Sequence, residues 1–166
     1  IATIAQLNSL SYPVERETVG EYLPELPELL KGAILALTAN MNAGKTWRIG
    51  KDWVMRLRHG IVLILTPNNS LGQQTANDFG LPHIHDFATD ADSQEALWAS
   101  VMNSGGLVCC PDSLHRIPDN ILNKIELLIL DEANQVINHL CEGDTIKSRW
   151  ANIHERFYQI CQIAVS

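Results

Sequence analysis

Hydrophobic runs alternate with amphipathic stretches along most of this chain. Short, nearly continuous apolar runs lie at 33–39, 60–67, 106–111 and 125–132. Runs of this length, bounded by turn residues, are typical of strands that are buried on both faces of a parallel sheet. Stretches with apolar residues at helical spacing lie at 45–59, 70–80, 92–106, 133–140 and 146–163. The alternation predicts an α/β domain with a mainly parallel sheet, right-handed crossovers and helices on both faces.

Local signals add detail to this pattern. Ser70 and Gly80 are expected to cap the helix between them, and Asp92 or Ser93 to cap the next helix. The segment LPHIHDF, residues 81–87, is interpreted as a further short strand. The large aromatic residues of the pattern are expected to lie in the core; they are Trp47, Trp53, Trp98 and Trp150.

Length and composition define the class of protein. A chain of 166 residues is long enough for one domain with a real core. Residues 1–31, with several prolines, are interpreted as a lead-in segment, and 32–166 as the domain. No window approaches the ~18 continuous apolar residues of a membrane helix. Because the chain starts at Ile1 without a leader, we interpret it as part of a larger protein or as trimmed at its start.

The cysteines indicate a reducing compartment. Cys109 and Cys110 are adjacent within an apolar run, and no cysteine pair has the C-x-x-C spacing of a metal site. Buried free thiols are therefore the favoured interpretation, and a cytoplasmic location fits it. His83 and His85 alternate with Ile84 and are a weaker metal candidate, because no third ligand is close in sequence.

Charge is unevenly distributed. The formal net charge of −7 argues against a general nucleic-acid-binding surface. Residues 45–58 are nevertheless basic, whereas residues 59–115 contain no Lys or Arg and several Asp and Glu. Charged residues on solvent-exposed faces would explain this distribution as well as a binding function would. Charge alone therefore does not assign a binding partner.

The segment TANMNAGKT, residues 38–46, indicates a phosphate-binding loop of the Walker A type. It follows a predicted strand and precedes a predicted helix, which is the context that such a loop requires. Lys45 would reach the β and γ phosphates of ATP, and the Thr46 hydroxyl would bind Mg²⁺. Gly44 is retained where backbone approaches phosphate, and Ala39 replaces the first glycine, which is tolerated if its φ is negative. Asn40, Met41, Asn42 and Ala43 form the variable arch of the loop.

An acidic pair supplies the second half of a nucleotide site. Asp131 and Glu132 follow the apolar run LLIL, so they are expected at the carboxyl end of a buried strand. Asp131 would hold Mg²⁺, and Glu132 would orient or deprotonate the attacking water. For Trp47 there is an alternative to packing in the core: its side chain would lie near the base of the bound nucleotide.

These motifs resemble those of superfamily 2 helicases. TANMNAGKT is similar to motif I, LILDEAN to motif II, and VLILTPNNSLGQQTANDFG to motif Ia. LVCCPDSLHRI and VINHLCEGDTIKSRW resemble segments of origin-binding replication helicases, the group of the herpesvirus origin-binding protein and of cyanobacterial plasmid replication proteins. The resemblance spans about residues 20–161 and implies a RecA-like P-loop NTPase domain that uses ATP and Mg²⁺ and acts on DNA.

The resemblance also implies residue roles. By position, Lys45 and Thr46 would contact nucleotide and Mg²⁺, and Asp131 and Glu132 would be the metal ligand and the catalytic carboxylate. Where family members often carry arginine in motif Ia, this chain has two asparagines, so phosphate contact there would rest on neutral donors. The residues that would touch a nucleic-acid strand are Thr66, Pro67, Asn68, Asn69, Ser70, Leu71, Ser113, His115 and Arg116.

The implied function depends on a second domain. The chain ends just where motif III would follow, so the second RecA-like domain of the parent is expected to supply the arginine finger. On this interpretation the fragment alone binds ATP weakly and hydrolyses it slowly or not at all. Two alternatives are a nucleotide-gated assembly module without catalysis, which the acidic composition favours slightly, and a P-loop kinase for small molecules. The kinase would need a basic lid, which residues 59–115 do not provide.

Overall fold

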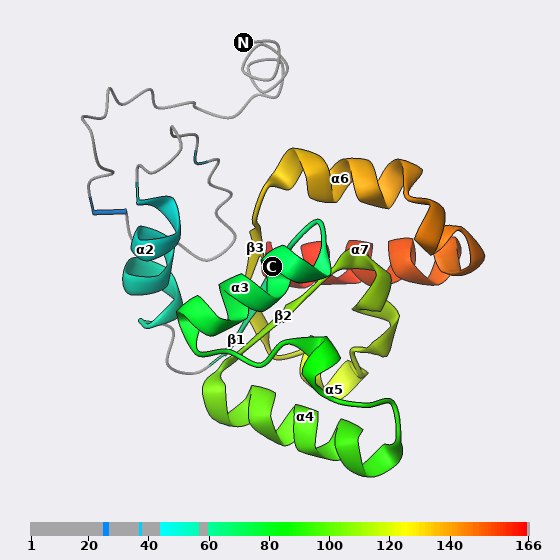
Figure 1. Ribbon diagram of the computed structural model, residues 1–166, viewed down its shortest axis with the longest axis horizontal. Helices are drawn as coiled ribbons and strands as arrows, with labels where there is room; N and C mark the ends of the chain where they lie inside the picture. Colours follow the sequence, from blue (N-terminus) through cyan, green and yellow to red (C-terminus); the bar gives the residue numbers. More distant parts are fainter. Residues whose placement is uncertain (1–24, 27–36, 38–43, 57–59, 166) are drawn as a thin grey trace.

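The computed structural model describes residues 25–26, 37, 44–56 and 60–165. Within them, helices and strands alternate along the chain (Figure 1). The elements are α2 (Lys45–Ile49), the π-helix η1 (Gly50–Val54), β1 (Ile61–Leu65), α3 (Asn69–Phe79), the 3₁₀ turn η2 (Ile84–Asp86), α4 (Ala91–Ser104), β2 (Gly106–Cys109), the 3₁₀ turn η3 (Pro111–Arg116), α5 (Asp119–Leu122), β3 (Ile125–Leu130), α6 (Ala133–Glu142), the 3₁₀ turn η4 (Asp144–Arg149) and α7 (Trp150–Ala164).

The described strands form a parallel sheet in the order β2-β1-β3. Leu63 lies at the centre of the sheet, opposite Leu107 on one side and Leu128 on the other. Every residue of β1 is buried, which is the burial expected of a strand that is covered on both faces. The predicted α/β class with a parallel sheet is therefore confirmed. The predicted strand at 33–39 lies outside the described residues.

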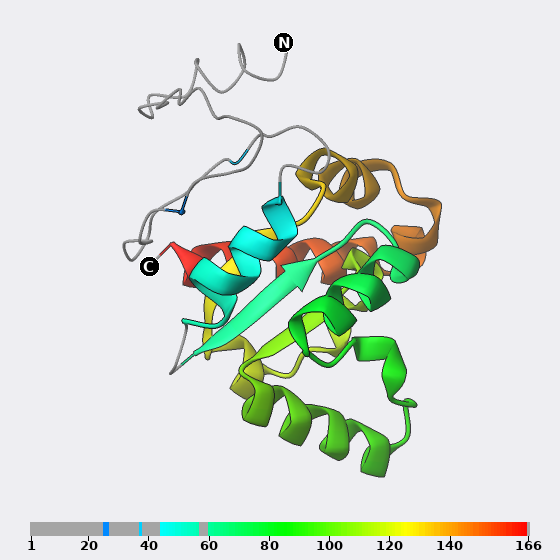
Figure 2. The same cartoon turned by 60° about the vertical axis from the view of Figure 1, so that its left-hand side comes forward.

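Helices cover both faces of the sheet, as predicted. Val62 and Ile64 point to the face on which Ala76 of α3 packs, together with side chains of α2 and η1. The other residues of β1 face a larger cluster that contains side chains of α4, α6 and α7. Figure 2 shows α2 and α3 on the near side of β1 and α7 on the far side. The period-2 alternation of each strand thus divides the core into two layers.

Asp52 ties the segment before the phosphate loop to the helix after it. The Asp52 side chain is buried, and its Oδ2 accepts a hydrogen bond of 2.9 Å from the Leu26 backbone N–H. Arg48 and Arg56 place guanidinium nitrogens 3.5 and 3.7 Å from its carboxylate oxygens. Arg56 also contacts Glu25 at 2.6 Å. A buried carboxylate needs such partners, because burial without them would cost several kcal/mol.

The predicted N-terminal caps of two helices are wrong by two or three residues. Asn68 caps α3, because its Oδ1 accepts the Leu71 N–H at 2.9 Å, so Ser70 lies inside the helix. Asp90 caps α4 through the Ser93 N–H at 2.9 Å, in place of Asp92 or Ser93. Gly80 ends α3 in the left-handed conformation, as predicted.

Two other boundaries differ from the sequence pattern. Segment 81–87 is not a strand: His83 makes a single bridge to Val108, and the chain then turns into η2. The Asp86 carboxylate accepts the His83 N–H at 3.3 Å, which favours the turn over a continued strand. The helix predicted at 146–163 begins later, at Trp150, because η4 occupies the first residues.

The tryptophans do not all lie in the core. Trp47 is 60% exposed and Trp150 is 51% exposed, so the prediction is wrong for these two. Arg48 and Lys51 lie over the Trp47 ring at 5.0 and 4.8 Å, and the His154 ring lies 4.1 Å from that of Trp150. Local contacts with cations and a neighbouring ring therefore replace burial. Trp98 packs against the core, as predicted.

The cysteines are free, as expected, and Cys109 and Cys110 are buried. Burial raises the pKa of both thiols, that of Cys110 to about 11. None of the described helices combines the length and the apolar character needed to cross a bilayer.

Gly72 of α3 lies close to the side chains of His83 and Thr66. A Cβ atom on Gly72 would lie 2.7 Å from His83 Nε2 and 2.8 Å from Thr66 Oγ1. His83 is 1% exposed, and neither ring nitrogen has a hydrogen-bond partner among the described residues. Burial lowers the pKa of this imidazole below its ordinary 6.5, so the ring is neutral at pH 7.

We predict that Gly72→Ala destabilises the protein by about 1–3 kcal/mol, because the added methyl group has no space between two buried side chains. Chemical denaturation monitored by circular dichroism measures the loss. Gln74→Ala, an exposed substitution on the same helix, is the control and should be nearly neutral. Equal stability of the two variants would show that the helix can shift away from His83.

We also predict that His83 makes stability depend on pH. In the unfolded chain His83 becomes protonated near pH 6.5, whereas in the folded protein its buried ring is protonated only at lower pH. The free energy of unfolding therefore falls as the pH drops below about 6.5. His83→Phe should remove part of this fall, as measured by urea titrations between pH 7.5 and 5. His154→Phe, at a half-exposed ring, serves as control. A pH profile unchanged by His83→Phe would contradict the assignment.

Candidate functional site

The carboxyl ends of all three described strands meet at one edge of the sheet, because the strands are parallel. The segment 66–69 follows β1, Cys110 and η3 follow β2, and Asp131 follows β3. In open parallel sheets this is the edge at which ligands bind. Most of the residues singled out from the sequence lie at this edge or at the start of α2.

Gly44, Lys45 and Thr46 form the described end of the phosphate loop. Gly44 has φ 76°, a left-handed conformation that a side chain would strain, and its carbonyl accepts the Arg48 N–H at 2.9 Å. Lys45 and Thr46 are the first two residues of α2; Lys45 is half-buried and Thr46 is exposed. The other predicted loop residues lie outside the described part of the chain: Ala39, Asn40, Met41, Asn42 and Ala43.

The acidic pair lies where the sequence places it. The Asp131 N–H donates to the Leu65 carbonyl at 2.9 Å, which extends the pairing of β3 with β1 by one residue. Glu132 then reverses the chain into α6 with φ 55° and ψ 54°. It is the one residue other than glycine with a positive φ among those described. A strained backbone of this kind costs about 1–3 kcal/mol and is often found at functional sites.

Asp131 interacts with both halves of the candidate site. Its carboxyl group is half-buried, and burial, followed by the neighbouring charge of Glu132, raises its pKa. The Lys45 ammonium opposes this rise, as does a hydrogen bond from the Thr75 side chain. Lys45 is therefore close enough to Asp131 for their charges to interact. The charge of Lys45 thus acts on an aspartate that is far from it in sequence.

The donor set suits a magnesium ion with nucleotide phosphates. Mg²⁺ is usually held by one or two protein oxygens, with water and phosphate oxygens completing the octahedron. A desolvated carboxylate beside a second acidic residue gains from such a cation. No group of three or more metal-ligating side chains occurs in the described ranges, including around His83 and His85. An all-protein metal cage is therefore not found in this part of the chain.

The segment after β1 separates into buried and exposed residues. Thr66 and Pro67 are buried, and the Thr66 hydroxyl donates to the Asn68 carbonyl at 3.2 Å. Asn68, Asn69 and Ser70 are exposed. Of the residues predicted here to touch a strand, Asn68, Asn69 and Ser70 are accessible, whereas the Thr66 side chain supports the turn from within.

The segment after β2 shows a similar division. Ser113 is 3% exposed, and its hydroxyl lies 3.2 Å from Nε2 of the exposed His85. His115 is half-buried, and its Nε2 lies 2.9 Å from the Arg149 guanidinium. Burial, and then the charge of Arg149, lowers the pKa of His115. Arg116 is half-buried, and its buried Nη2 atom has no hydrogen-bond partner among the described residues.

Several residues at this edge were not singled out for a specific role. Cys110 contacts Asn69, His85 contacts Ser113, and the Thr75 side chain lowers the pKa of Asp131. Each interaction joins residues from different elements, so no local spacing indicates it. Thr75 alone gives a weak signal, since it is a buried polar residue on the apolar side of α3.

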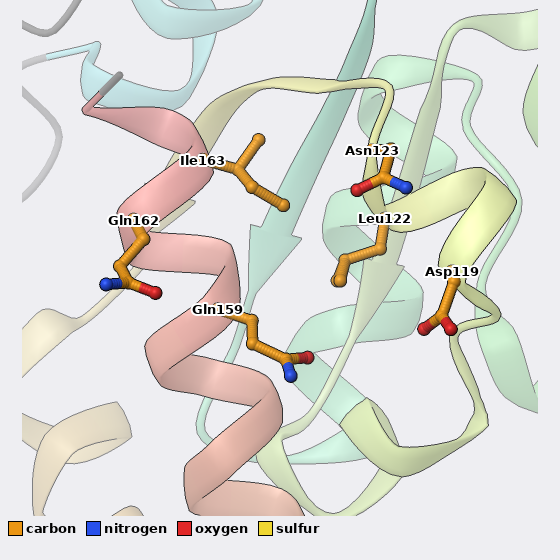
Figure 3. A pocket seen from close by; sticks show the side chains of 6 residues that line it. All are labelled: Asp119, Leu122, Asn123, Gln159, Gln162 and Ile163. Atoms are coloured by element: carbon orange, nitrogen blue, oxygen red, sulfur yellow. The ribbon is translucent and has the colours of Figure 1, made fainter.

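A shallow hollow of about 510 Å³ lies elsewhere, between α5 and α7 (Figure 3). Asn123, which lines it, precedes the start of β3, so the hollow is at the end of this strand opposite the acidic pair. Its one acidic lining residue, Asp119, is paired with Arg156 at 2.6 Å. The hollow is thus separate from the candidate nucleotide site.

A family comparison agrees with this arrangement. Residues 25–165 match the family described as DEAD/DEAH box helicase. The chain belongs to the DEAD/DEAH box helicase family. The match covers the phosphate loop, the acidic pair and all of the described helices and strands. Comparisons with curated proteins and with solved structures gave no match. An ATP-binding, helicase-type motor domain is therefore supported, whereas the narrower resemblance to origin-binding helicases is not confirmed.

We predict that Thr75→Val raises the pKa of Asp131 further, because a hydrogen bond that favours the carboxylate is lost. NMR titration of the side-chain carboxyl carbon, assigned by its loss in Asp131→Asn, measures the shift. Thr145→Val, at an exposed threonine in η4, should leave the Asp131 pKa unchanged. An unshifted Asp131 in Thr75→Val would show that the two side chains are not hydrogen-bonded in solution.

Proposed function

We propose that this chain is the first motor domain of a DNA helicase or translocase that acts in DNA replication. The observation that carries the proposal is the action of the Lys45 charge on Asp131, whose raised pKa it opposes, at the carboxyl edge of the sheet in a chain of the DEAD/DEAH box helicase family. The replication role, and a plasmid or viral-origin type of parent, rest on the resemblance of segments 107–117 and 136–150 to origin-binding helicases. A cytoplasmic setting fits the free thiols.

The residues of the site would divide the work of ATP hydrolysis. Lys45 would bind the β and γ phosphates, and the residues of the loop, 39–44, would surround them with backbone N–H groups. Thr46 and Asp131 would hold Mg²⁺, which neutralises charge on the phosphates when it is bound. Glu132 would orient the attacking water and accept its proton. Trp47, which is exposed beside Thr46, would contact the nucleotide base.

Nucleic acid would bind at the neighbouring segments on the same edge. Asn68, Asn69 and Ser70 would provide exposed donors there. His115 and Arg116 are half-buried and would contribute less, because the Nδ1 of His115 and the Nη2 of Arg116 are buried. Thr66, Pro67 and Ser113 are buried, so we assign them to the support of these segments. Thr75, on the helix that begins at Asn69, lowers the pKa of Asp131 and so would link the strand-binding segment to the acidic pair.

A second RecA-like domain is the proposed partner for catalysis. Transition-state charge on the transferred phosphoryl group is usually stabilised by an arginine, at a rate gain of about 10³–10⁵. Lys45 and the acidic pair would not replace that arginine, because their proposed roles are to bind the phosphates and the metal and to position the attacking water. The isolated chain is therefore expected to bind nucleotide with little turnover.

We expect Mg·ATP to bind the chain and Lys45→Ala to weaken binding by about tenfold or more, because a charge-assisted contact with phosphate is lost. Isothermal titration calorimetry measures both affinities. Lys124→Ala is the control, since this exposed lysine precedes β3, at the end of the strand opposite the acidic pair. It should bind Mg·ATP nearly as the wild type does.

The outcomes separate the candidate functions. Equal affinity of wild type and Lys45→Ala, with both variants folded, would refute the phosphate-loop assignment. Binding in the longer parent with DNA present, but without hydrolysis, would favour a nucleotide-gated assembly module. Transfer of phosphate to a metabolite in a substrate screen would favour a kinase.

A further inference from the structure

We infer that Cys110 is a positioning residue, whose thiol holds the side-chain amide of Asn69 so that its N–H groups face a nucleic-acid strand. The inference rests on the proposed function, because it concerns the strand-binding edge of the sheet. It adds a residue that neither the motifs nor the family match assigns. It also indicates how an acidic chain without arginine in this segment could contact phosphate.

The two residues meet because β1 and β2 are parallel neighbours. Asn69 begins α3 after β1, and Cys110 directly follows β2. The Cys110 Sγ–H donates to Asn69 Oδ1 at 3.0 Å. Cys110 is 3% exposed, whereas Asn69 is exposed. A buried thiol thus holds the side chain of a surface asparagine that is 41 residues away in sequence.

The thiol remains a donor at physiological pH. Burial raises the pKa of Cys110 to about 11, so the sulfur keeps its proton. Thr66 Oγ1 lies 3.9 Å from Sγ on another side of the sulfur. The Thr66 hydroxyl already donates to the Asn68 carbonyl, which leaves the thiol proton for Asn69.

Occupation of the amide oxygen decides what Asn69 offers to solvent. An asparagine side chain carries one accepting oxygen and two donating N–H bonds. With Oδ1 held by Cys110, the exposed part is the donating part. Asn68 is arranged in the same way, because its Oδ1 accepts the Leu71 N–H at 2.9 Å. Two adjacent exposed side chains therefore present donors, and the phosphate oxygens of a nucleic-acid backbone only accept.

Neutral donors have a distinct physical signature. Each Lys or Arg that neutralises a phosphate releases counterions and steepens the salt dependence of binding. An asparagine contributes a hydrogen bond without that effect. Loss of the Asn69 contact should therefore lower affinity by a similar factor at low and at high salt.

The experiment measures binding of a fluorescein-labelled oligo-dT strand to the full chain by fluorescence anisotropy. Cys110→Val keeps the volume but removes the donor, and we expect affinity to fall about three- to tenfold, the range of one hydrogen bond. Cys110→Ser keeps a donor and should bind within about twofold of wild type. Cys161→Val, at a half-buried thiol on α7 without a contact to this edge, is the matched control and should bind as wild type.

A double-mutant cycle separates positioning from general damage. If Cys110 acts through Asn69, Asn69→Ala and the pair Asn69→Ala with Cys110→Val should lose the same affinity. Independent structural damage would instead give additive losses and a lower thermal midpoint for Cys110→Val. The slope of log K against log salt should be the same for wild type and Cys110→Val.

Each remaining outcome has a defined meaning. Unchanged binding by Cys110→Val, or additive losses in the cycle, would overturn the inference and leave the proposed function intact. Failure of the wild type to bind the strand while it binds Mg·ATP would overturn both the strand-binding part of the proposed function and the role of Cys110. Failure to bind either ligand would refute the proposed function as a whole.

Discussion

The parallel pairing of β1 with both β2 and β3 is the constraint on which the site depends. Parallel strands end at the same edge, so the segments that follow them are brought together whatever their separation in sequence. The pairing places Cys110 beside Asn69 and allows the Asp131 N–H to reach the Leu65 carbonyl. Without it, these polar groups would be unrelated side chains in separate loops.

The site combines a rigid support with locally unfavourable features. All of β1 is buried between two layers of side chains, so its carboxyl end has little freedom to move. On this support, Glu132 takes a left-handed conformation and Asp131 is held in a half-buried position beside a like charge. Both features oppose stability, as strained or desolvated groups at functional sites often do. At Asp131, the charges of Lys45 and of a bound metal would compensate for burial beside a like charge.

Polar contacts, more than excess positive charge, organise the proposed strand-binding edge. Ser113 contacts His85, Arg149 contacts His115, and the thiol of Cys110 contacts Asn69. Each contact orients a side chain that is at least partly exposed, using a group from another element. A chain with a net charge of −7 can in this way present donors locally while its overall field repels nucleic acid. Specific contact then depends on geometry, since long-range attraction does not assist it.

The sequence by itself determined the fold class and the positions of the two motifs. A continuous apolar run such as 61–65 favours a strand that is buried on both faces. The phosphate-loop motif Gly44-Lys45-Thr46 and the acidic pair Asp131-Glu132 can be located from local spacing alone. The sequence did not determine that Trp47 and Trp150 are exposed, that Asn68 and not Ser70 caps α3, or that 81–87 makes only one bridge to β2. Those outcomes depend on competition between neighbouring groups for the same hydrogen bonds and the same space. The effect of Thr75 on the Asp131 pKa and the contact of Cys110 with Asn69 were decided by the tertiary structure alone, because they join residues whose only relation is the order of strands in the sheet.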